Sequence, residues 1–223
     1  MSTVRALRRF VRNAPAAPGP ARAHVQGESC ELCHAPIGAA HDHVVDLEAR
    51  RLCCACRACA LLFEKPGAAR GRYRAVPRRV HHWIAGGEEE QALGALQLPV
   101  GLAFFFFNSR LGRWVAHYPG PAGATESELP LDAWARLSEG NPLVAAAEPD
   151  VEAILVYAPR GKGRNECFLV PIDACYELTG ALRRTWKGFD GGDEARAWLR
   201  AFFDGLKKRS RPLPSARPAG DLR

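Results

Sequence analysis

Two closely spaced pairs of cysteines constrain this chain more than any other feature of its sequence. Cys30 and Cys33 are separated by two residues, and Cys56 and Cys59 repeat that spacing further along the chain. A Cys-x-x-Cys turn can direct two thiolates at one position about 2.3 Å from each sulfur, which is the length of a Zn–S bond. Two such pairs supply the four ligands of a closed tetrahedral site. The sequence therefore predicts a zinc-binding module at residues 28–64.

The residues between and after the two pairs suit a β-hairpin followed by a short helix. Residues 43–47 are expected to form one strand and residues 51–54 the return strand, with residues 48–50 as the turn. The second cysteine pair would then open a short helix that runs through residues 61–63. A knuckle, a hairpin and a helix in this order form a treble clef, and a zinc ribbon is the nearest alternative.

The sequence does not decide as clearly which of the neighbouring thiols bind the metal. Cys53 is itself followed by a cysteine at the third position, Cys54 lies next to it, and either could replace one of the four ligands. We expect thiols on the return strand to pack inward as small hydrophobic groups. The predicted ligands are Cys30, Cys33, Cys56 and Cys59. His34, His41 and His43 are candidate substitutes, but we interpret them as surface residues because four thiols suffice.

Zn²⁺ is the ion that this pattern predicts, and an iron–sulfur cluster, which thiolates also hold, is the alternative. A site with four protein ligands has no open position for water or substrate, so we expect the metal to be structural. A segment this short cannot bury enough apolar surface to fold alone. Metal binding would therefore supply its folding free energy.

The remaining polar residues show no spacing that indicates catalysis. A Cys-x-x-Cys pair followed by His41 and His43 is similar to part of the zinc-bearing HNH nucleases. The chain lacks their asparagine before the second pair and their histidine after it, where Arg57 stands. Cys167 and Cys175 lie in apolar segments and are expected in the core. The sequence gives no ground to predict an enzyme.

Beyond the module, the sequence predicts an α+β body at residues 100–208. A linker at residues 65–99 is expected to hold one short strand and a helix near residues 88–96. The strands of the body are expected to pair as two hairpins, residues 101–107 with 113–118 and residues 153–158 with 166–170. Four successive phenylalanines, at positions 104–107, indicate a strand that is covered on both faces.

Two longer helices are predicted at the end of the body. Apolar residues recur at three- and four-residue steps in residues 172–186 and 193–206, as on the buried face of an amphipathic helix. Glycines in residues 188–192 supply a turn, so the two helices are expected to pack together on an antiparallel sheet. Earlier in the body, residues 119–128 are expected to be loop and residues 131–137 a short helix.

The net charge of +7 is concentrated at the two ends of the chain. Residues 1–27 hold five arginines and no acid, and residues 204–223 hold six basic and two acidic residues. These compositions predict a disordered basic lead-in at residues 1–27, which would also suit a transit peptide, and a disordered tail at residues 209–223. No apolar run approaches the roughly 18 residues of a membrane span. With no secretory signal, we expect a cytoplasmic protein whose thiols stay reduced.

Because the basic charge lies in the ends, the body carries no basic excess that would predict a nucleic-acid-binding protein. A basic segment just after the module keeps that function open as an alternative. Its candidate phosphate contacts are Arg70, Arg72, Arg74, Arg78 and Arg79. Binding through such contacts would weaken steeply as the salt concentration rises.

Two segments of the sequence carry a resemblance to a known family. One runs from the first cysteine pair through residues 43–47 to the cysteine-rich run at residues 51–63, and the other covers residues 170–178 and 186–192. They resemble an uncharacterised zinc-ribbon-like family that is encoded beside uptake nickel–iron hydrogenase genes in actinobacteria and related bacteria. The resemblance implies a role near hydrogenase maturation, assembly or electron transfer, and thiolate ligation at the matching cysteines.

The sequence as a whole predicts a non-catalytic metal-binding accessory protein of the α+β class. It would act through contacts with a protein partner, a hydrogenase subunit or a maturation factor. The alternatives are a nucleic-acid-binding zinc module and an iron–sulfur electron-transfer protein.

Overall fold

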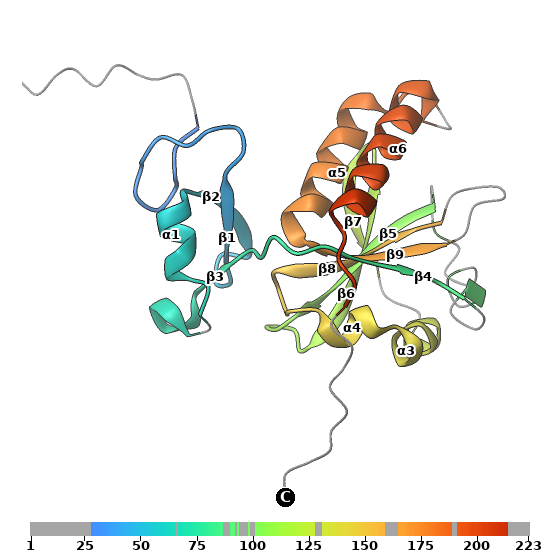
Figure 1. Ribbon diagram of the computed structural model, residues 1–223, viewed down its shortest axis with the longest axis horizontal. Coiled ribbons are helices and arrows are strands. Elements are labelled where there is room, and N and C mark those ends of the chain that lie inside the picture. The colour runs from blue at the N-terminus through green and yellow to red at the C-terminus, as the bar shows by residue number, and fades with distance from the viewer. Residues whose placement is uncertain are drawn as a thin grey trace, which may run out of the picture.

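The computed structural model describes residues 28–65, 67–86, 90–91, 93, 98, 101–127, 131–158, 165–188 and 191–213. The predicted lead-in at residues 1–27, most of the helix expected near residues 88–96 and most of the C-terminal tail lie outside these residues. The described chain forms a small cysteine-rich module and a larger body with a six-stranded sheet (Figure 1). This organisation confirms the predicted α+β class with antiparallel sheets.

The module contains the predicted hairpin and helix, shifted by about one residue at their ends. β1 (Asp42–Asp46) pairs antiparallel with β2 (Arg51–Ala55), and α1 (Arg57–Leu62) follows the second cysteine pair. Asp46 shapes the turn after β1 because its Oδ1 accepts hydrogen bonds from the backbone N–H groups of Glu48 and Ala49, both at 3.0 Å. Such a local carboxylate bond is the usual reason for aspartate at a turn.

The segment predicted as a linker contributes one strand to each sheet instead of a single short strand. β3 (Tyr73–Ala75) pairs with β1, so the order of the first sheet is β2-β1-β3. β4 (His81–Ile84) pairs with β9 (Glu166–Pro171) at the edge of the second sheet. Strands of three and four residues are too short to show a period in the sequence, and their partners lie far along the chain.

The body is built on a six-stranded antiparallel sheet. Besides β4 and β9, its strands are β5 (Leu102–Asn108), β6 (Arg113–Gly120), β7 (Gly123–Ser127) and β8 (Glu152–Tyr157). The spatial order is β4-β9-β8-β5-β6-β7. Both predicted hairpins are present, as β5–β6 and β8–β9. The loop expected at residues 119–128 was wrong, because β7 there pairs with β6 as an edge strand of small and polar residues.

Helices cover both faces of this sheet, which explains the run of phenylalanines in β5. Phe104 points into a core beneath α5 (Ile172–Thr185) and α6 (Gly192–Arg209), whereas Phe105 points into a second core on the opposite face. The second core is closed by α3 (Leu131–Gly140) and α4 (Pro142–Ala146), which lie on the other side of the sheet in Figure 1. Successive side chains of a strand alternate between faces, so both must be apolar here.

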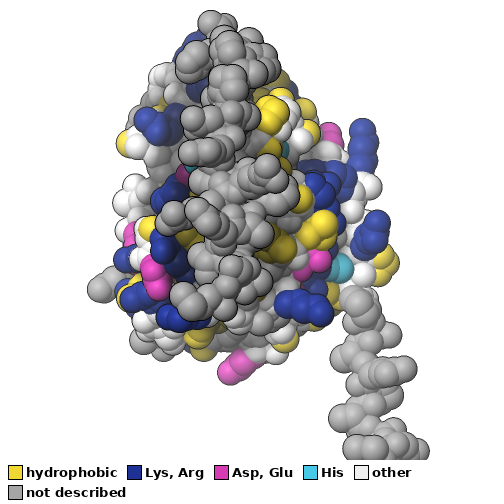
Figure 2. Space-filling view, turned by 90° about the vertical axis from the view of Figure 1, so that its left-hand side faces the viewer, with side chains coloured by type: hydrophobic (Ala, Val, Ile, Leu, Met, Phe, Trp, Pro, Cys, Tyr) yellow, Lys and Arg dark blue, Asp and Glu magenta, His cyan; other side chains and the backbone are white. Residues whose placement is uncertain are grey.

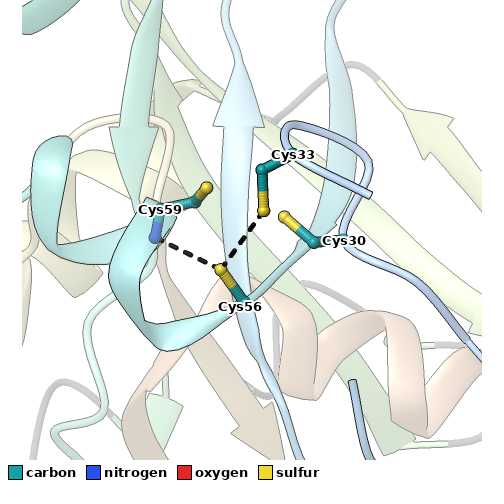
Figure 3. Close-up of side chains that lie close together, drawn as sticks. All are labelled: Cys30, Cys33, Cys56 and Cys59. Atoms are coloured by element: carbon teal, nitrogen blue, oxygen red, sulfur yellow. Dashed lines mark hydrogen bonds between the residues drawn. The ribbon is translucent and has the colours of Figure 1, made fainter. Parts of the chain in front are cut away.

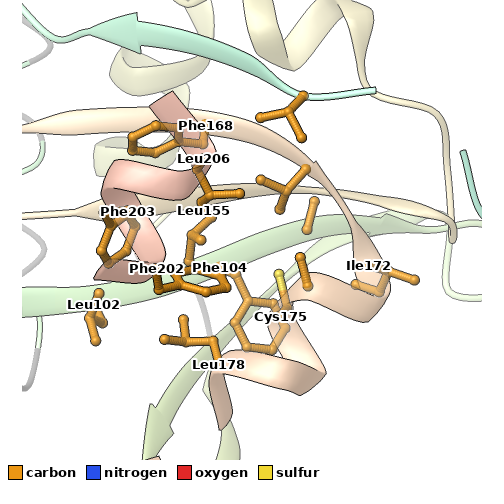
Figure 4. Packing of buried hydrophobic residues seen from close by; sticks show 14 of the residues in the cluster. Leu102, Phe104, Leu155, Phe168, Ile172, Cys175, Leu178, Phe202, Phe203 and Leu206 are labelled. Carbon is orange, nitrogen blue, oxygen red and sulfur yellow. The ribbon is translucent and has the colours of Figure 1, made fainter. Parts of the chain in front are cut away.

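The first of these, the α5–α6 core, holds many of the largest fully buried side chains (Figure 4). It includes Leu102, Phe104, Leu155, Phe168, Leu178 and Phe203. Cys175 lies in the same core and Cys167 in the one opposite, so the prediction that both are core residues is confirmed. The two C-terminal helices pack together as predicted. Among the described residues, no helix combines the length and the apolar character that crossing a bilayer requires.

The chain stays ordered past the point where the sequence analysis placed the tail. α6 continues to Arg209, and the N–H of Arg211 donates to the carbonyl of Val80 at 2.9 Å. Leu213 packs against the core closed by α3 and α4. A basic, proline-containing composition is typical of disorder, but one apolar anchor and one backbone bond fix these residues.

The module is held against the body by apolar contacts and by arginines. Val45 and Leu52, from β1 and β2, pack against the α5–α6 core. Arg74 donates to the carbonyl of Pro149 at 2.7 Å. Arg79 forms a two-pronged ion pair with the fully buried Glu152, with N–O distances of 2.6 and 2.7 Å. Paired contacts of this geometry are the strong form of charge-assisted hydrogen bond.

Candidate metal centre

The first cysteine pair lies on a tight knuckle that the backbone holds in place. The N–H of Cys30 donates to the carbonyl of Ala35, and the N–H of His34 donates to the carbonyl of Cys30, both at 2.8 Å. The chain reverses at His34, which has a left-handed φ of 60°. The N–H of Glu31 donates to the carbonyl of Cys54 at 2.9 Å, so the knuckle is attached to β2.

The second pair is placed by the first turn of α1. Cys56 is the N-cap residue, and its Sγ accepts a hydrogen bond from the N–H of Cys59 at 3.5 Å. Residues three positions apart lie on the same side of a helix, so the two sulfurs face the same way. The knuckle, the hairpin and the helix follow one another in the order that the sequence analysis expected for a treble clef.

The four predicted cysteines converge. Their sulfur atoms all lie within 4.8 Å of one another, and Sγ of Cys33 is 3.7 Å from Sγ of Cys56. Figure 3 shows the four side chains pointing towards a common centre from the knuckle and from the start of α1. A tetrahedral ion with bonds of 2.3 Å would hold its sulfurs about 3.8 Å apart. The sulfur atoms are therefore close enough to one another for the group to hold one metal ion.

The environment of the group differs from one thiol to the next. Burial raises the pKa of Cys30, but backbone N–H groups of Cys56, Cys33 and Leu32 donate to its sulfur and lower that pKa to about 6 overall. Burial raises the pKa of Cys59 well above its ordinary value. A bound cation would favour the thiolate form at all four positions.

Neither neighbouring cysteine joins this group among the described residues. Cys53 is buried and lies opposite Val44 in the hairpin, in line with the prediction that it packs inward. Cys54 lies on the other face of β2, partly exposed, opposite His43. The sequence could not separate these thiols from the four because strand register, not spacing, decides which face each one occupies.

Two of the three nearby histidines are not the surface residues that the sequence analysis expected. The side chain of His41 is only 8% exposed, and that of His43 is 21% exposed. The body and the knuckle cover them, which no local pattern reveals. His34 is exposed as predicted.

Four of the five arginines proposed as phosphate contacts are engaged with carboxylates of the chain itself. These pairs are Arg72 with Asp46, Arg74 with Glu148, Arg78 with Asp42 and Arg79 with Glu152. The hydrogen bonds from Arg72 lower the pKa of Asp46 to about 2. On the face shown in Figure 2, the described Lys and Arg side chains are spread around hydrophobic ones rather than gathered into one patch.

A cleft of about 140 Å³, lined by both polar and apolar side chains, lies between the β1–β2 hairpin and the body. Arg50, Arg51 and Arg110 line it together with His117 and Asp150. Nδ1 of His117 and Oδ2 of Asp150 are buried without a hydrogen-bond partner within the described structure. The sequence analysis missed this cleft, and no sequence signal marks it, because its walls come from elements far apart in the chain.

Comparison with known proteins places the chain in a family. The model of one protein family, Family of unknown function (DUF5947), matches residues 29–210, which include both the module and the body. The chain belongs to the DUF5947 family. No curated protein and no solved structure matches it. The four converging cysteines of this DUF5947 protein all lie within the matched residues.

Proposed function

We propose that this DUF5947 protein is a non-catalytic, zinc-binding accessory protein that acts through contacts with a partner protein. One observation carries the proposal: four thiols converge within 4.8 Å, enough to fill every position of a tetrahedral ion. A zinc ion held in this way has no open position at which to activate water. Its effect would be to fold and stiffen the short module.

The surface of the module supports a role in docking. Leu61 and Leu62 lie on α1, two and three residues after Cys59, and they are 46% and 66% exposed. Adjacent exposed leucines on an element that the metal would hold rigid offer a small preorganised contact surface. We place the partner among nickel–iron hydrogenase subunits or maturation factors, in the cytoplasm, on the basis of the resemblance carried by the cysteine-rich run and the C-terminal segments.

An all-thiolate donor set also keeps the iron–sulfur alternative in view. The close spacing of the sulfurs favours a single ion, because the thiolates of a cluster bind different iron atoms and stand further apart. Elemental analysis of protein purified without oxygen separates the two. We expect colourless protein containing zinc, and we expect the Cys33→Ala variant to lose the ion of the four-cysteine site. Stoichiometric iron with visible absorption would replace the zinc proposal by an electron-transfer protein.

Co-purification from a native host tests the partner. The tagged full-length chain is expected to recover a hydrogenase component. A variant with Leu61→Ser and Leu62→Ser should keep its zinc but lose that component. Leu111→Ser is the matched control, because Leu111 is 44% exposed on the body, in the β5–β6 turn. A chain that never associates with hydrogenase components, and whose deletion leaves hydrogenase activity intact, would count decisively against the proposal.

A further inference from the structure

A second group of metal-ligating side chains lies in the module, outside the four cysteines. A ring nitrogen of His41, a ring nitrogen of His43 and Sγ of Cys54 all lie within 4.8 Å of one another. His43 on β1 and Cys54 on β2 are direct partners in the hairpin, and His41 precedes β1. Because strand side chains alternate, His43 and Cys54 share the face opposite to Val44 and Cys53.

Hydrogen bonding prepares His41 as a ligand through Nε2. Its Nδ1 lies 2.8 Å from the carbonyl oxygen of Gly38, and Oε2 of Glu28 is 3.4 Å from the same nitrogen. A carbonyl only accepts, so Nδ1 carries the proton and the lone pair of the neutral ring lies on Nε2. Nε2 is buried, with no partner in the described part of the chain, inside a side chain that is 8% exposed. A buried nitrogen without a hydrogen bond is unfavourable, and a bound cation would offset that loss.

His43 is oriented in the same way by the body. Its Nδ1 lies 2.9 Å from Oδ2 of Asp173, in the first turn of α5. A carboxylate accepts this bond, so His43 also presents its Nε2 lone pair. A histidine that donates one ring N–H to a carboxylate and binds the ion through its other nitrogen is the usual arrangement around a protein-bound metal ion.

We propose that His41, His43 and Cys54 form a second metal site for Zn²⁺ or an ion of similar character, separate from the four-cysteine site. Two imidazoles and one thiolate are ligands that Zn²⁺ accepts, and three protein ligands leave the fourth tetrahedral position open. The ion at this site is therefore exchangeable and can take a ligand from solvent or from a partner. Through Asp173 its occupancy is linked to the N-terminus of α5.

Zinc stoichiometry of the full-length chain tests the site. Protein equilibrated with Zn²⁺ and freed of excess ion is expected to hold two ions per chain. Cys54→Ser and His41→Ala should each hold one, with a far-UV circular dichroism spectrum like that of the wild type. Cys53→Ala and His34→Ala are the matched controls and should hold two, because neither residue belongs to a ligand group.

A Co²⁺ titration of zinc-loaded protein provides a second reading. When zinc occupies only the four-cysteine site, the protein should bind one Co²⁺ ion at the second site. The bound Co²⁺ should show the visible absorption of a tetrahedral complex. Asp173→Asn should weaken that binding by about 10- to 100-fold. A wild-type chain that binds only one zinc and no Co²⁺ overturns the proposal, and so does a Cys54→Ser chain that still binds two. The wild-type measurement decides the question even if a variant does not fold.

Discussion

The imidazole of His117 shows what burial does to a single residue in this protein. Its ring stacks between Phe104 and Phe106, with centroid distances of 5.1 and 5.4 Å. Its Nδ1 is buried without a partner within the described structure. Burial lowers the pKa of His117, and the charge of Glu126 opposes part of that shift. The folded chain therefore holds this histidine neutral at neutral pH.

This environment predicts a pH dependence of stability. The unfolded chain binds a proton at this histidine at about pH 6.5, whereas the folded chain binds it only at a lower pH. The free energy of unfolding is therefore unaffected by this group above about pH 6.5 and falls as the pH drops below that value. His117→Phe keeps the stacked ring and removes the titration. We expect the free energy of unfolding to change less between pH 7.5 and pH 5.5 in this variant than in the wild type, as measured by urea denaturation. The same pH dependence in both proteins would contradict the prediction.

At the scale of elements, α5 connects the core of the body to the face of the module. One side of the helix carries buried residues such as Leu178 and Leu182 into the α5–α6 core. Its first turn presents Asp173 to His43. Its last turn holds Arg183 and Arg184. An acidic residue in the first turn and basic residues in the last turn interact favourably with the helix dipole. A change in the packing of α5 is therefore expected to move Asp173 and so to change the orientation of His43.

Truncation of this helix's buried face should be costly. Leu178 is fully buried, and Leu178→Ala is expected to lower the free energy of unfolding by about 2–5 kcal/mol through lost apolar contact and the cavity it leaves. Glu177→Ala, at the exposed neighbouring position, should change it by no more than about 0.5 kcal/mol. Denaturant midpoints of the two variants measure the contrast. If both substitutions lowered the free energy of unfolding equally, the packing of Leu178 in the core would be contradicted.

At the scale of the whole molecule, the two parts draw stability from different sources. The core of the module consists of Cys30, Val44, Ala55, Cys59 and Ala60, with a few partly buried neighbours. The body has two extensive cores on either side of its sheet. Small clusters of this kind need a metal or a covalent staple, whereas a body of this size can fold on apolar burial alone.

Metal removal should therefore act unequally on the chain. After treatment with a strong chelator, we expect amide hydrogens in β1, β2 and α1 to lose protection from exchange. Those in β8, β9 and α5 should remain protected, because their hydrogen bonds lie in the body. Hydrogen exchange read by mass spectrometry resolves the two regions. Full protection of β1 and β2 in metal-free protein would show that the module does not depend on an ion.

The spacing of the cysteines was enough to find the four converging thiols, and the residues between and after the two pairs were enough to find the hairpin and α1. The sequence also predicted β5, β6, β8, β9 and the two C-terminal helices. These features depend on contacts between residues close in sequence, so apolar periodicity and turn residues record them.

Only the tertiary structure decided what depends on distant contacts. It partly covered two histidines expected at the surface and paired four arginines of the basic segment with the protein's own acids. It also gave the linker a second strand and the body the edge strand β7. His43 and Asp173 are 130 residues apart in sequence yet share a hydrogen bond. No local sequence pattern predicts such a pair, because the two side chains lose their contacts with water and form their hydrogen bond only when the module packs against the body.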